Sequence, residues 1–394
     1  MAPVKLDMDR LIDDRRTRII VCCGSGGVGK TTAAAAIGLR AAERGRRVVV
    51  LTVDPARRLA QSMGLTSLDN TPRRVDGVDT ADGGSLHAMM LDMKRTFDEI
   101  VEAHADPDRA AQILANPFYQ SLSSSFAGTQ EYMAMEKLGQ LRHADEWDLI
   151  VVDTPPSRSA LDFLDAPQRL GRFLDGRLIR LLTVPAKAGM SYMKVLNAGF
   201  AMMTSALTKI LGAQVLKDAQ TFVTALDTMF GGFRERAEST YRLLQAPGTA
   251  FVVIAAPEPD ALREASYFVE RLDAERMPLA GLILNRVHTS PAARLSAARS
   301  LAASETLDYQ NEPTVPGSPG VEYPPGLNGG RALAAAALRL HAERMQLGKR
   351  ERRLAEHFTS AHPAVPVAEV PAQPEDVHDL GGLRLIGELL CEGF

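Results

Sequence analysis

Cysteine is scarce in this chain, which has only Cys22, Cys23 and Cys391 among 394 residues. Three cysteines cannot build a disulfide framework or a four-cysteine zinc site within one chain, and no Cys-x-x-Cys occurs. Cys22 and Cys23 lie in an apolar run, where buried structural thiols are expected. The composition therefore indicates a reduced, cytoplasmic protein, and it leaves peripheral attachment to a membrane open.

Long hydrophobic runs and an excess of one charge are also missing. The longest uncharged apolar stretch, Val195 to Thr208, falls short of the about 20 residues that span a bilayer. The first residues alternate charged and single apolar side chains, unlike a signal peptide. The net charge of -3 leaves no broad basic surface, so no nucleic-acid partner is expected.

The apolar runs that are present are short and rich in β-branched residues. Ile19–Cys23 is followed by a glycine loop, an alanine-rich helix from Lys30 to about Arg44, and a second run from Arg47 to Val53. Later runs of the same kind are Leu149–Val152, Phe251–Ile254 and Leu282–Leu284. Near-continuous apolar strands separated by helices predict an α/β fold with a doubly wound, mostly parallel sheet.

The glycine loop carries a phosphate-binding motif. Gly24-Ser25-Gly26-Gly27-Val28-Gly29-Lys30-Thr31 fits G-x-x-x-x-G-K-[ST] and lies between a predicted strand and a predicted helix. Its glycines let successive backbone N–H groups face phosphate oxygens, and the helix N-terminus adds its positive dipole end. Lys30 is expected to reach the β- and γ-phosphates and Thr31 to hold Mg²⁺. A glycine turn that binds nothing is the alternative.

Two aspartates follow predicted strands. Asp153 comes directly after Leu149–Val152, as in a Walker B element, and is expected to hold Mg²⁺ directly or through water. Asp54 ends the strand after the phosphate-loop helix. Both lie at the carboxyl ends of parallel strands, where ligands bind in this architecture. A turn or helix-capping role is the alternative for each.

These motifs together resemble the arsenite-pump and tail-anchored-protein targeting ATPase family, which belongs to the deviant-Walker-A, SIMIBI-type group of P-loop NTPases. The resemblance extends over most of the chain. It rests on the phosphate loop and on four further segments. These are Thr52-Val53-Asp54-Pro55-Ala56, Asp153-Thr154-Pro155-Pro156-Ser157, Leu284-Asn285-Arg286 and the tail from Val370 to Val377.

The resemblance implies a Mg²⁺-dependent ATPase that forms a dimer, which opens and closes with its nucleotide. It assigns Asp54 to the attacking water, and Asp153 to coupling Mg²⁺ to the second switch loop. The resemblance assigns adenine binding to Asn285 and to Pro371 in the tail from Val370 to Val377, and no guanine motif N/T-K-x-D occurs. The implied phosphate and nucleotide ligands are Gly26, Gly27, Val28, Gly29, Lys30, Thr31 and Thr32.

The predicted organisation has three parts. Residues 1–170 and 241–394 form the nucleotide-binding core, and residues 171–240 form a helical insertion without strand signals. A mobile Pro- and Gly-rich loop is predicted at 305–330. The insertion contains Met190, Met193, Met202, Met203 and Met229, which suit a groove for an apolar helix cargo or a membrane protein. A methionine-containing core or dimer interface is the alternative.

The chain departs from the family pattern at Ser25, where members usually carry a second lysine that crosses the dimer interface. Either a heterodimer with a lysine-bearing paralogue, or substitution by Arg57, Arg58 or Arg158, would supply the missing cation. A slow or mainly nucleotide-binding homodimer is the third reading. The cysteine triad that binds arsenite has no counterpart, so metalloid export is disfavoured.

Two other functional classes share these residues. One is a nucleotide-switched regulatory or positioning protein similar to MinD and ParA, which a basic amphipathic C-terminus would favour. Residues Gly381–Phe394 are only weakly amphipathic and are expected to form the last packed helix. The other is the energising subunit of a membrane transporter, which only a membrane partner would distinguish.

Overall fold

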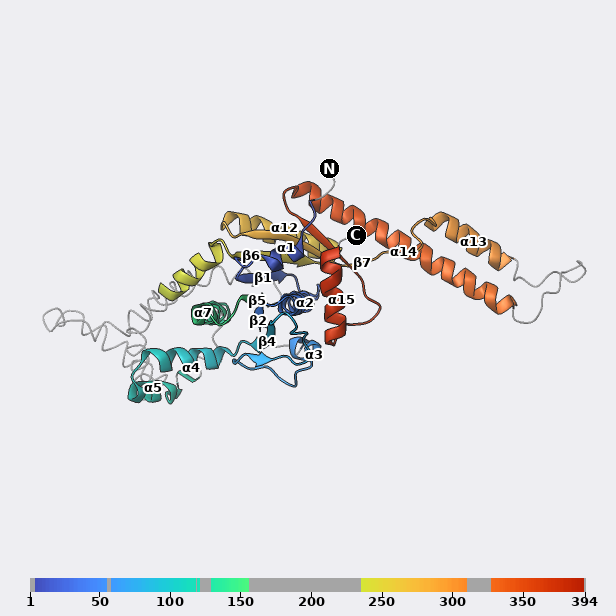
Figure 1. The fold of residues 1–394 in the computed structure, drawn as a ribbon. Helices are drawn as coiled ribbons and strands as arrows, with labels where there is room; N and C mark the ends of the chain where they lie inside the picture. Colours follow the sequence, from blue (N-terminus) through green and yellow to red (C-terminus); the bar gives the residue numbers. More distant parts are fainter. Residues whose placement is uncertain are drawn as a thin grey trace, which may run out of the picture.

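The computed structural model describes residues 4–54, 58–117, 119–120, 129–155, 235–309 and 327–392. These residues form one α/β body with an arm of two helices extending from it (Figure 1). The helices are α1 (Met8–Asp13), α2 (Lys30–Glu43), α3 (Arg58–Ser62), α4 (Met93–His104), α5 (Pro107–Leu114), α7 (Thr129–Ala144), α12 (Pro259–Ala274), α13 (Ala297–Tyr309), α14 (Leu327–Ala361) and α15 (Leu380–Glu392). The strands are β1 (Ile19–Gly24), β2 (Arg47–Thr52), β3 (Arg73–Arg74), β4 (Ser85–Met90), β5 (Leu149–Asp153), β6 (Thr249–Ala255), β7 (Leu279–Val287) and β8 (Val367–Pro371).

The strands form a single sheet in the order β3-β4-β2-β5-β1-β6-β7-β8. Every neighbouring pair is parallel except β3 and β4 at one edge. Every residue of β1, β5 and β6 is buried. Parallel strands covered on both faces need continuous apolar runs, which explains why the sequence marked them clearly. The predicted doubly wound, mostly parallel sheet is confirmed.

Helix α2 packs closely on the sheet because its inner residues are small. Ala34, Ala35 and Ala36 have no exposed surface. A Cβ at Gly38 would lie 2.5 Å from the Val50 side chain of β2. The helix ends before Gly45, whose φ of +79° suits glycine at a helix end, as the sequence predicted.

Some elements differ from the sequence expectation. β3, β4 and β8 were not predicted, and residues Glu305–Tyr309, expected in the mobile loop, belong to α13. That loop prediction was too wide because its prolines begin only at Pro313. The last helix, α15, forms as predicted. Of the predicted insertion, residues 235–240 are helical, and 171–234, with the five methionines, lie outside the described residues.

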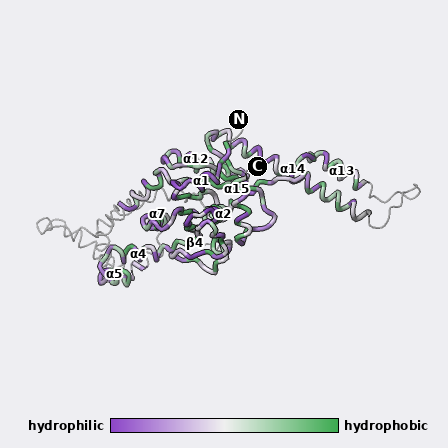
Figure 2. The backbone as a smooth tube through the Cα atoms, in the orientation of Figure 1, coloured by the Kyte–Doolittle hydropathy of each residue, from purple (hydrophilic) through white to green (hydrophobic). Residues whose placement is uncertain are grey.

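Helices α13 and α14 lie side by side and project from the body as an arm (Figure 1). Figure 2 shows hydrophilic and hydrophobic residues alternating along both helices of this arm. Within the described ranges, no helix is both long and apolar enough to span a membrane. The base of α14 joins the body at β7, where Glu351 accepts hydrogen bonds from the backbone N–H of His288 (2.8 Å) and pairs with its Nδ1 (2.7 Å).

Candidate nucleotide-binding site

The phosphate loop connects β1 to α2 at the carboxyl ends of the central strands. Gly24 approaches β6 so closely that a Cβ there would lie 2.1 Å from the carbonyl oxygen of Ile254. Gly29 has a φ of +92° and immediately precedes α2, whose first N–H groups therefore face the loop. Gly26 and Gly27 are exposed at the loop's outer turn. The glycines thus serve both close packing and a turn that opens toward solvent.

Asp153 lies at the end of β5 with no exposed surface. Its Oδ2 accepts hydrogen bonds from Thr31 Oγ1 (2.8 Å) and Thr52 Oγ1 (2.9 Å). Its buried Oδ1 has no hydrogen-bond partner among the described residues. Burial raises the pKa of Asp153 to about 6, against the two threonine hydrogen bonds and the charge of Lys30, which lower it. A cation beside this carboxylate would relieve the cost of burying its charge.

Lys30 begins α2 and points back along the phosphate loop. Its Nζ donates a hydrogen bond to the backbone carbonyl of Ser25 at 2.7 Å. Burial lowers the pKa of Lys30, and the nearby Asp153, Cys23 and Asp54 raise it. The ammonium therefore lies within the loop that is expected to receive phosphates.

Asp54 follows β2 and is half-buried beside the same cluster. Its backbone N–H donates to Thr52 Oγ1 at 3.2 Å. Its charge raises the pKa values of both Asp153 and Lys30. Residues 55–57, which follow Asp54, and residues 156–158, which follow Pro155, lie outside the described residues, as do the candidate substitutes Arg57 and Arg158.

Asn285 brings β7 against the phosphate loop. Its Nδ2 donates to the carbonyl oxygen of Val28 at 2.8 Å, and its Oδ1 accepts from the Arg286 N–H at 3.0 Å. Pro371 lies at the end of the neighbouring β8, opposite Val287. Both residues that carry the adenine resemblance therefore lie on the β7–β8 side of the loop.

The structure brings Lys30, Thr31, Asp54 and Asp153 together at the carboxyl ends of the central strands β1, β2 and β5. Thr32 is half-buried in the first turn of α2. Sequence reasoning missed Thr52, whose hydroxyl joins the cluster, although a lone hydroxyl at the end of an apolar strand was the available signal. The roles of Lys30, Thr31, Asp54 and Asp153 in nucleotide binding stay predictions.

The two cysteines of β1 are buried, as predicted. Burial raises the pKa of Cys23 to about 12 and that of Cys22 well above its usual value. Both thiols therefore stay protonated and inert. No group of three or more His, Cys, Asp or Glu side chains with metal-binding geometry occurs in the part of the chain that the structure describes.

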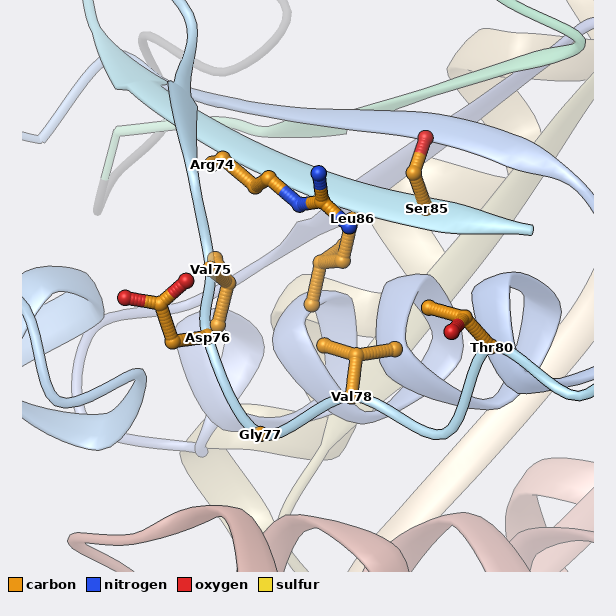
Figure 3. Close-up of a pocket in the computed structure, with 8 residues that line it drawn as sticks. All are labelled: Arg74, Val75, Asp76, Gly77, Val78, Thr80, Ser85 and Leu86. Atoms are coloured by element: carbon orange, nitrogen blue, oxygen red, sulfur yellow. The ribbon is translucent and has the colours of Figure 1, made fainter. Parts of the chain in front are cut away.

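A small cavity lies away from this cluster, between the turn at Asp76–Val78 and the start of β4 (Figure 3). Its volume is about 110 Å³, and none of the phosphate-loop residues lines it. Ligand pockets for small molecules usually measure roughly 300–1,000 Å³. This cavity is therefore too small for a nucleotide.

A phosphate loop at the carboxyl end of a parallel sheet, with a strand-end aspartate bonded to its threonine, defines a P-loop nucleotide-binding protein. The model of the anion-transporting ATPase family matches residues 17–308, and the chain belongs to this family. It is therefore an ATP hydrolase by family. This finding confirms the resemblance that the motifs indicated.

Similar proteins include several fungal proteins named ATPase GET3. The protein from Ajellomyces dermatitidis is 24% identical over 283 residues, which cover 71% of this chain and 76% of that protein. The protein from Schizosaccharomyces pombe is 23% identical over 290 residues, with 73% and 79% coverage. The match to the Malassezia globosa protein is 28% identical over 167 residues and spans 42% of this chain and about half, 47%, of that relative.

Proposed function

We propose that this ATPase binds ATP with Mg²⁺ at the phosphate loop and uses its hydrolysis to open and close a dimer. The observation that carries the proposal is the Thr31–Asp153–Thr52 cluster, in which one carboxylate oxygen is buried without a partner among the described residues. A buried, unpaired carboxylate oxygen is costly unless a cation or donor meets it. The cluster therefore fits a site that a cation completes.

Asp153 and Thr31 are the residues that would hold Mg²⁺. Carboxylate and hydroxyl oxygens are hard ligands, which this small cation prefers, and it commonly takes only one or two protein ligands with phosphates and water. When bound, Mg²⁺ supplies positive charge to the phosphate oxygens. Asp153 would hold it directly or through water, and Thr52 holds the carboxylate in its orientation through the 2.9 Å hydrogen bond.

Lys30 and the loop N–H groups of Gly26, Gly27, Val28 and Gly29 would bind the phosphates, with Thr32 at the α-phosphate. When phosphate binds, the Lys30 ammonium would give up its hydrogen bond to the Ser25 carbonyl oxygen and donate to phosphate oxygens instead. Phosphate oxygens are stronger acceptors because they are charged. Asp54, half-buried beside the cluster, orients the attacking water. Positioning and charge stabilisation of this kind supply most of the catalysis in phosphoryl transfer.

Adenine recognition is proposed on the β7–β8 side, from Asn285 and from Pro371 in the tail from Val370 to Val377. The support is the hydrogen bond from Asn285 to Val28 of the phosphate loop, and the position of Pro371 on β8, the strand that pairs with β7. Competition of ATP and GTP for a fluorescent nucleotide tests this assignment. ATP is expected to compete more strongly, and equal competition would contradict it.

The proposal also covers the dimer partner and the cargo of this ATPase. Because Ser25 cannot supply charge across an interface, we propose a partner paralogue that carries the lysine of the family pattern. The cargo class is an apolar helix or a membrane protein, a proposal that rests on the methionines in the sequence of the predicted insertion, 171–240. A homodimer that turns over ATP as fast as the mixed complex would contradict the paralogue.

The experiment that tests the function is Mg²⁺-dependent ATP hydrolysis by the purified chain, with light scattering to report oligomeric state. Lys30→Ala is expected to lower turnover by more than about 100-fold, since it removes the charge at the developing phosphate oxyanions. Lys94→Ala is the matched control, because Lys94 pairs with Asp98 on the surface of α4. If the wild-type chain binds ATP but does not hydrolyse it, hydrolysis requires the complex with the partner paralogue.

A further inference from the structure

Helix α14 carries a row of exposed leucines along the arm. Leu333, Leu340 and Leu347 have 72%, 65% and 38% of their surfaces exposed. They recur at seven-residue spacing, which places them on one face over almost four turns of helix. Leucine at this spacing is the seam pattern of a helix that pairs with another helix.

The opposite face of α14 is already taken by α13. Ala335 and Ala342 are fully buried there. His341 fixes the hairpin as well, because its ring nitrogens bond to Ser290 Oγ (2.9 Å) and to the Leu295 carbonyl oxygen (2.8 Å). The packing against α13 therefore orients the leucine row outward, on the side of α14 that no described residue covers.

The residues beside the leucine row differ between its two ends. They are small at one end, where another helix can approach closely, and charged at the other. Ala336 and Ala337 flank the row near Leu333 and are exposed. Glu343 and Arg344 flank it between Leu340 and Leu347 and are also exposed. The row therefore has a small, uncharged end and a large, charged end, with Leu340 midway between them.

We propose that α14 pairs with α14 of a second copy of this chain in antiparallel orientation, centred on Leu340. An antiparallel pair places Leu333 of each copy against Leu347 of the other. It also lays the Arg344 side chain of one copy along the alanine end of the other, where its aliphatic stem covers the alanines. A parallel pair would instead stack Arg344 on Arg344, which like-charge repulsion opposes.

The charge distribution favours a second copy over a lipid surface. The basic residues Lys349, Arg352 and Arg353 lie more than about 100° around the helix from the leucine row, by helical geometry. Glu343 and Arg344, one of each sign, lie beside the row itself, and Arg350 lies farther along the same side of the helix. An anionic membrane would require a basic cluster without acidic neighbours on the leucine side of α14. The arm therefore fits a protein partner with the same mixed charge.

Cross-linking tests the pairing and its orientation. In a chain with Cys391→Ser, Leu340→Cys is expected to form a disulfide between two copies under mild oxidation. Leu333→Cys alone is expected not to do so, whereas Leu333→Cys with Leu347→Cys restores the link. Adding Lys30→Ala should leave these links unchanged, so their outcome does not depend on the proposed nucleotide function.

Sedimentation measures the contribution of the row to association. Leu340→Glu, which keeps a strong helix former, is expected to raise the dissociation constant of the pair by more than about tenfold. Leu385→Glu is the matched control, because Leu385 is 44% exposed on α15. Equal dissociation constants, or efficient self-linking of Leu333→Cys, would overturn the pairing. If Leu340→Glu lost binding to anionic vesicles while the two copies still associated as in the wild type, the leucine row would bind a membrane and the pairing would be overturned.

Discussion

The side chain of Asn285 bonds at both ends within the protein. Its amide N–H reaches the Val28 carbonyl oxygen and its oxygen accepts from the next backbone N–H. An amide has a second N–H and further lone pairs, so these bonds leave capacity for a base. The single side chain of Asn285 therefore holds the phosphate loop in place and is also proposed to contact adenine.

Gly29 makes this contact possible, and its substitution is the residue-scale prediction. A Cβ at Gly29 would lie 2.3 Å from Asn285 Nδ2. Gly29→Ala is therefore expected to displace Asn285 or the loop and to weaken nucleotide binding by more than about tenfold, beyond the about 1 kcal/mol that a left-handed alanine costs. Titration with a fluorescent nucleotide measures the affinity.

Gly27→Ala is the matched control for that change. Gly27 also has a positive φ, of +79°, but a Cβ there meets nothing within 4 Å. It carries the backbone strain without the clash. Equal affinities of the two variants would show that Asn285 does not constrain the loop, and Asn285→Ala should partly rescue Gly29→Ala if it does.

At the scale of elements, two ion pairs attach the short helix α1 to the phosphate-loop helix, one between Asp9 and Arg40 and one between Asp13 and Arg44, the residue that caps α2. Asp9 accepts two hydrogen bonds from Arg40 of α2, at 2.7 and 2.9 Å. The Arg40 hydrogen bonds lower the pKa of Asp9 to about 2. The folded state therefore releases this proton more readily than the unfolded chain does. The stabilisation is present above about pH 4 and is lost as the pH falls toward 2.

Asp9→Asn is expected to lower the free energy of unfolding by about 1 kcal/mol at pH 7, a value reduced because about a third of the side chain is exposed. The difference from wild type should shrink between pH 4 and pH 2, because protonation removes the same charge. Urea unfolding across this range measures it. Asp260→Asn is the control, since Asp260 pairs with Arg263 on the surface, where both side chains are largely exposed. A difference that stays constant with pH would refute the ion-pair account.

The sequence predicted the central strands because burial on both faces demands continuous apolar runs. The strands at or near the edges were missed because their residues are only partly buried and do not form continuous apolar runs. β8 alternates half-buried and buried residues and ends in Pro371, and β3 is two exposed arginines. β4 lies one strand from the edge and contains Ser85 and His87, which interrupt the apolar pattern. Burial on one face, or at an edge, leaves a weaker pattern.

The site was predictable to the extent that its chemistry is local in sequence. The spacing of Gly24 to Thr31 fixes the phosphate loop, and Asp153 is marked by the strand before it. Long-range contacts have no such signal. Arg46, fully buried, donates to the carbonyl oxygens of Ile12 and Thr17, in the N-terminal segment before β1, and of Asp148, just before β5. Only the folded topology brings such partners together.

At the scale of the whole molecule, the question is whether one copy carries a complete site. Within the described residues, Lys30 is the lysine of the phosphate loop, and the family position for a second one holds Ser25. Ser25 contributes its backbone carbonyl to Lys30, a contact that does not depend on its side chain. A substitution there can therefore add a charge without removing this hydrogen bond.

Ser25→Lys tests whether that missing charge limits turnover. If two copies face each other across their phosphate loops, a lysine at 25 adds a cation to the partner's nucleotide, and ATP turnover is expected to rise by about tenfold or more. Ser25→Gln, which has similar length but no charge, should not reproduce the rise. Lys30→Ala in the same chain should abolish it. Steady-state hydrolysis at several protein concentrations measures the effect, which should grow with concentration because the added cation acts between copies. Turnover unchanged in Ser25→Lys, from a protein that light scattering shows to be dimeric, would mean that the two loops do not face each other.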